Sequence, residues 1–102
     1  MADEVALTFT LPGKSDANRA TWRADPPAFL VDGEYRLKDE SYDTLVYEAN
    51  VTSGAMKILM FGMAKTLYTL AITFRDAEDG NTQVTITGKA MPKVQEALAQ
   101  YG

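Results

Sequence analysis

The chain has 102 residues and a net charge of -4, which is enough for one domain with a single modest core and argues against nucleic acid as a partner. It contains no cysteine and no histidine, which excludes disulfide frameworks, thiolate metal sites and the commonest general base. No apolar run approaches the roughly 20 residues that cross a bilayer, and the acidic N-terminus lacks the regions of a signal peptide. We therefore expect one domain over residues 1–102, located in the cytoplasm.

Residues 5–11 alternate between apolar and polar side chains, which predicts a strand that ends at Pro12. Ser15 is a suitable N-cap for a helix over residues 16–24. Trp22 lies off the small-residue stripe of this helix, so we expect it either at an edge of the core or exposed. We expect the stripe itself to pack on a sheet, and it consists of Ala17, Ala20, Thr21 and Ala24.

Two prolines end this helix, because their rings clash with the preceding turn and lack an N–H donor. Asp25 can cap a second, short helix with Pro26 at its first position, and that helix would end near Gly33. Its apolar residues are Phe29, Leu30 and Val31.

Residues 34–38 and 42–51 alternate in the same way and predict the next two strands, joined by an acidic turn. Tyr35 and Leu37 are expected to face inward from the first. The inward residues of the second are Leu45, Tyr47, Ala49 and Val51.

Residues 55–65 form the most apolar interval of the chain and predict either a helix or a tightly packed loop. No acidic residue occurs between Glu48 and Asp76. The three basic residues of that interval are Lys57, Lys65 and Arg75.

Residues 66–75 and 82–89 flank a turn that contains Asp79 and Gly80, a strong signal for a β-hairpin. One face of the hairpin is apolar and carries Tyr68, Leu70, Ile72, Phe74, Val84 and Ile86. The other face is polar and carries Thr69, Thr73, Arg75, Gln83, Thr85 and Thr87. This alternation predicts an antiparallel sheet with one face on the core and one in water.

Pro92 can open a C-terminal helix. The face expected to pack inward carries Val94, Ala97, Leu98 and Tyr101. The predicted fold is α+β, a five-stranded antiparallel sheet with helices packed on one face, in the order β-αα-ββ-(α)-ββ-α.

This order of elements resembles a shortened helix-grip domain of the Bet v 1 or START-like superfamily. Residues 33–37 (Gly-Glu-Tyr-Arg-Leu), 45–48 (Leu-Val-Tyr-Glu) and 80–88 (Gly-Asn-Thr-Gln-Val-Thr-Ile-Thr-Gly) are also similar to small conserved bacterial domains of unknown function. Full helix-grip proteins are longer and have more strands and a longer last helix. The resemblance implies the same grip of helices on a sheet, and a bacterial source.

We expect a non-enzymatic binding module that uses no cofactor or metal and offers a small apolar pocket or groove. The expected binding residues are Trp22, Phe29, Leu30, Met56, Leu59, Met60, Phe61, Met63 and Leu98. Residues 56–63, the methionine segment, leave three alternatives open. They can fill gaps in the core, form an interface with a protein partner or a second copy, or contact a small apolar ligand or a membrane surface.

Other chemistry is poorly supported. The acidic residues 76–81 lack the spacing of a calcium loop and fit a solvated hairpin turn. Ser15, Ser41 and Ser53 have no histidine base. The threonine-rich sheet face has too few aromatic or basic residues to hold single-stranded nucleic acid.

Overall fold

The computed structural model describes residues 4–51 and 66–101. In chain order its elements are β1 (Glu4–Leu11), α1 (Ser15–Ala24), α2 (Ala28–Asp32), β2 (Arg36–Glu40), β3 (Thr44–Val51), β4 (Thr66–Asp76), β5 (Thr82–Lys89) and α4 (Pro92–Ala99). The apolar element expected over residues 55–65 lies outside the described residues.

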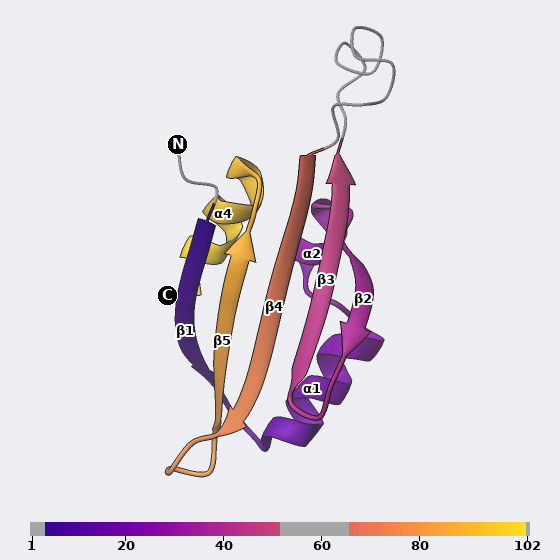
Figure 1. Ribbon diagram of the computed structural model, residues 1–102. Coiled ribbons are helices and arrows are strands. Elements are labelled where there is room, and N and C mark those ends of the chain that lie inside the picture. The colour runs from indigo at the N-terminus through magenta and orange to yellow at the C-terminus, as the bar shows by residue number, and fades with distance from the viewer. Residues whose placement is uncertain (1–3, 52–65, 102) are drawn as a thin grey trace, which may run out of the picture.

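The five strands form one antiparallel sheet in the order β1-β5-β4-β3-β2. All the helices of the described residues lie on one face of this sheet, and no described helix covers the other face, called the open face below (Figure 1). Helices α1 and α2 lie behind the β4-β3-β2 side, and α4 lies behind β1 and β5 (Figure 1). The predicted α+β fold is therefore confirmed.

The hairpin between β4 and β5 closes as its sequence predicts. The Ala77 N–H donates to the Asn81 carbonyl at 2.8 Å, and Asp79 accepts from the Asn81 N–H at 3.1 Å. Gly80 has a φ of 84°, a left-handed conformation in which glycine carries no steric penalty.

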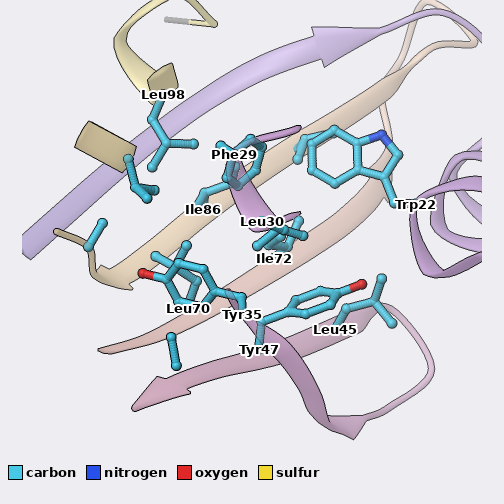
Figure 2. Packing of buried hydrophobic residues seen from close by; sticks show 14 of the residues in the cluster. Trp22, Phe29, Leu30, Tyr35, Leu45, Tyr47, Leu70, Ile72, Ile86 and Leu98 are labelled. Carbon is cyan, nitrogen blue, oxygen red and sulfur yellow. The ribbon is translucent and has the colours of Figure 1, made fainter. Parts of the chain in front are cut away.

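The core lies between the sheet and the helices (Figure 2). Leu70, Ile72 and Val84 are fully buried at 0% exposure, so the predicted inward face of the hairpin is confirmed. The remaining buried apolar side chains come from β3, β4, β5 and the helices, and they include Leu45, Tyr47, Ala49, Phe74, Ile86, Trp22, Phe29, Leu30, Val94 and Leu98.

Helix α1 packs through a different face from the one expected. The small-residue stripe Ala17, Ala20, Thr21 and Ala24 is exposed, whereas Trp22 is buried. Trp22 packs against Phe74 of β4, with ring centroids 5.4 Å apart, and polar contacts add to this. The Asn18 amide donates to Thr82 Oγ1 of β5 at 2.7 Å and to the Pro12 carbonyl at 3.0 Å.

The predicted helix caps are also wrong. Lys14 precedes α1, and the Ser15 N–H donates to Asp76 Oδ1 at 3.0 Å, so a side chain from the end of β4 satisfies the first turn. Pro27, rather than Asp25, precedes α2.

Two other expectations fail at the margins of the sheet. Leu37 is 37% exposed because β2 is the outer strand and bends at a bulge between Leu37 and Asp39. Tyr101, expected on the inward face of the C-terminal helix, is 39% exposed.

Candidate functional site

The two outer strands of the sheet are built differently. β2 has five residues, a bulge and four charged side chains, and Lys38 forms an ion pair with Glu48 at 2.5 Å. Such short, charged and irregular edges resist pairing with other chains. β1 has eight residues in unbroken register with β5, and its sequence contains no charged residue or proline from Val5 to Leu11. The described residues place no strand beyond it.

The core-facing side chains of β1 are only half-buried. They pack against the core cluster but remain partly exposed, and they are Val5, Leu7, Phe9 and Leu11. Interior strands of this sheet bury the same positions completely, as Ile72 and Ile86 do. The incomplete burial follows from the position of β1 at the end of the sheet, because one flank has no neighbouring strand.

Helix α4 turns this edge into a groove. A hollow of about 300 Å³ lies between β1 and α4, and it is lined by Val5, Ala6, Leu7, Gln95, Leu98 and Ala99. The Gln95 amide is held in place because its Nε2 donates to the Ala90 carbonyl at 2.6 Å. We call this hollow and the free edge of β1 the β1 groove.

Aromatic rings line the core beside the β1 groove. The rings of Phe9 and Tyr101 lie 5.0 Å apart between centroids, and Tyr101 also meets Phe29 at 5.7 Å. Trp22 lies 6.2 Å from Phe9. These contacts fix Phe9, so its apolar surface is preorganised rather than free to collapse inward.

The structure describes four of the nine predicted binding residues. Trp22, Phe29 and Leu30 are buried in the core, with the rings of Trp22 and Phe29 5.9 Å apart (Figure 2). Leu98 is also buried, and it forms part of the wall of the β1 groove. The other five, Met56, Leu59, Met60, Phe61 and Met63, lie outside the described residues.

Five groove residues were absent from the prediction: Val5, Ala6, Leu7, Gln95 and Ala99. The sequence shows that β1 alternates, but not that it ends the sheet. The absence of charge from residue 5 to residue 11 was the one available signal of an unprotected edge.

The open face of the sheet carries a second hollow, shallow and about 680 Å³ in volume. Its lining includes Thr69, Ala71, Thr87, Gly88 and Lys89. At Gly88 a Cβ atom would approach the Thr69 carbonyl oxygen to 2.0 Å, so no larger residue fits there. Glu4 and Val5 complete its lining.

The polar cluster beneath α1 is structural. Arg23 is hydrogen-bonded to Glu40, which lowers the pKa of that carboxyl, and Arg19 donates to the Ser41 carbonyl at 2.7 Å. Burial raises the pKa of Tyr47 above its usual range. Within residues 4–51 and 66–101, no group of three acidic, histidine or cysteine side chains could hold a metal ion.

No helix in the described part of the chain is long and apolar enough to cross a membrane. Comparisons with protein-family models, with curated proteins and with solved structures found no match. The helix-grip resemblance therefore stays a prediction.

Proposed function

We propose that this chain is a non-enzymatic binding module that takes up an extended apolar segment in the β1 groove, by strand addition to β1. The observation that carries the proposal is the contrast between the two edges, because β2 is short, bulged and charged whereas β1 is long, regular and uncharged from residue 5 to residue 11.

An edge strand and an apolar groove supply the two parts of strand recognition. The free N–H and C=O groups along β1 can hydrogen-bond to an added strand whatever its sequence. Val5, Leu7 and Leu98 can then select apolar side chains at alternate positions of that strand. The groove volume of about 300 Å³ is at the lower limit for small-molecule pockets, so it suits a few side chains better than a whole ligand.

The non-enzymatic part of the proposal rests on the side chains available. The sequence has no histidine or cysteine. The acidic residues of the described part are exposed or half-buried, so none has the deep burial that sets a pair of carboxyl pKa values apart.

A synthetic peptide of alternating valine and threonine, with lysines at its ends for solubility, tests the proposal. Titration followed by backbone amide NMR shifts should move the resonances of β1 and α4 and leave those of β2 unchanged. Perturbation confined to β2, or no saturable perturbation, would contradict it.

Two alanine positions make a matched pair of variants. Ala99 and Ala24 are each the last residue of a helix and each is exposed, but only Ala99 lines the β1 groove. Ala99→Lys places a charge where apolar side chains must dock and should weaken peptide binding about tenfold, or roughly 1.4 kcal/mol. Ala24→Lys should bind like the original chain. Equal peptide affinities for the two variants would show that the peptide does not bind in the β1 groove.

A further inference from the structure

We infer that the segment that occupies the β1 groove is β1 of a second copy of this chain, paired antiparallel about a two-fold axis, so that the two sheets become one continuous sheet. The inference rests on the proposed function and names its partner. Its observations are the register of the sheet, the lining of the groove and the placement of charge around β1.

The alternation of β1 sets the register of such a pair. In antiparallel strands, residues directly opposite each other project to the same face. Only pairing centred on Thr8 brings every residue from Val5 to Leu11 opposite another member of that stretch. Val5 then faces Leu11 of the second copy, and Leu7 faces Phe9 of the second copy. The half-buried residues of both copies thus meet on the core side.

The same register fills the groove. Val5 and Leu7 form the strand wall of the hollow, with Leu98 and Ala99 on the helix side. Leu11 and Phe9 of the second copy lie directly opposite that strand wall. Each groove therefore receives one aliphatic and one aromatic side chain, and the two-fold axis repeats the arrangement at the other groove.

Charge favours the antiparallel arrangement. Glu4 is the only charged residue of β1, and both Glu4 and Lys14 are exposed. Pairing centred on Thr8 separates the two Glu4 side chains by about eight residues, or roughly 27 Å at 3.4 Å per residue. It also places each Glu4 opposite Pro12 of the other copy, two residues before Lys14, which carries the opposite charge.

A row of threonines on the open face would continue through the pair. Thr8 lies opposite Thr85, Thr85 opposite Thr73, and Thr73 opposite Thr44, in one line across four strands. The hydroxyls of Thr8 and Thr85 lie 3.4 Å apart, and those of Thr44 and Thr73 lie 3.2 Å apart. With Thr8 on the axis, the two Thr8 side chains become neighbours and the row runs unbroken through both copies.

The position of Thr8 provides the test. Sedimentation velocity over a dilution series should show a reversible change from twice the mass of the chain to the mass of one chain. Thr8→Lys puts two like charges directly opposite each other and should weaken the dimer about fivefold, the equivalent of about 1 kcal/mol. Thr8→Glu should do the same.

An equal mixture of Thr8→Lys and Thr8→Glu should restore dimerisation to at least the original strength, because unlike charges then face each other across the axis. Thr87→Lys is the matched control, since Thr87 is exposed on the same face one strand further in, and it should leave the dimer unchanged. Failure of the mixture to restore the dimer would overturn the register. A dimer unaffected by Thr8→Lys, or weakened equally by Thr87→Lys, would overturn the interface.

The failure of this inference can be told apart from that of the proposed function. A chain that stays monomeric at all concentrations but binds the valine–threonine peptide overturns the second copy and leaves strand addition in place. A chain that is monomeric and also fails to bind the peptide overturns both.

Discussion

Tyr35 connects the segment after α2 to the end of β5 through a single hydrogen bond. Its hydroxyl donates to the Lys89 carbonyl at 3.0 Å, and the side chain is buried in the core (Figure 2). Burial, followed by a smaller effect of Tyr68, raises the pKa of Tyr35 to about 12 from an ordinary value of 10.0. The phenol therefore stays protonated in the folded chain to higher pH than in the unfolded chain.

This raised pKa predicts a loss of stability in alkali. Because the folded pKa lies above the unfolded pKa, the stabilising contribution is complete below pH 10 and is lost as the pH rises towards about 12. Tyr35→Phe should remove that part of the alkaline decline, and at pH 7 it should cost about 1 kcal/mol from the lost hydrogen bond. Denaturant unfolding at a series of pH values measures both effects.

Tyr47 is the internal control for this prediction. Burial also raises its pKa, so Tyr35→Phe should leave a smaller alkaline decline rather than none. If the stability of Tyr35→Phe falls with pH as steeply as that of the original chain, the hydroxyl of Tyr35 does not titrate with folding.

Among the helices, α1 shows where the sequence was informative and where it was not. Its end at Ala24 was predicted correctly because two prolines follow it, and its start was predicted to within one residue. Its orientation was not, because the side facing the sheet carries Asn18 and Arg19 and only one large apolar residue, Trp22. Hydrophobic periodicity cannot find a face that has a single large apolar residue and otherwise polar contacts. The partner of Asn18, Thr82, is 64 residues away in sequence.

The inward faces of the strands were predictable because their contacts are apolar. The inward positions of β3, β4 and β5 follow a two-residue period, which one apolar face imposes along the whole strand. The β1 groove was not predictable, since it depends on which strand ends the sheet. That property follows from the pairing of β1 with β5, between residues more than 70 positions apart.

The orientation of α1 gives a prediction at the scale of the element. Trp22 meets the ring of Phe74 at 5.4 Å and that of Phe29 at 5.9 Å, so Trp22→Ala should leave a cavity and cost about 3–5 kcal/mol of unfolding free energy. Ala20→Ser, on the exposed side of the same helix, should change it by less than about 0.5 kcal/mol. Denaturant unfolding followed by circular dichroism suits both variants, because Trp22→Ala removes the only tryptophan. If both substitutions lowered the unfolding free energy equally, the small-residue stripe, and not the side with Trp22, would be the packing face of α1.

At the scale of the whole molecule, both outer strands of the sheet could pair with strands of other chains. Charged side chains and a bulge protect β2. β1 carries no such protection from Val5 to Leu11, and pairing with one second copy would use its free edge completely. A closed two-fold pair would leave the two β2 strands as the outer edges of the described sheet, so further growth of the sheet would be disfavoured.

This arrangement predicts a specific pattern of amide hydrogen exchange. In β1, alternate N–H groups point away from β5 and should exchange quickly when the chain is dilute. Raising the chain concentration should slow exchange at those positions between Val5 and Leu11, because they become hydrogen-bonded to the second copy. The amides of β2, from Arg36 to Glu40, serve as the control and should exchange at the same rate at every concentration. Protection that rises at β2 while β1 stays unchanged would show that the charged edge, and not the regular one, is where copies meet.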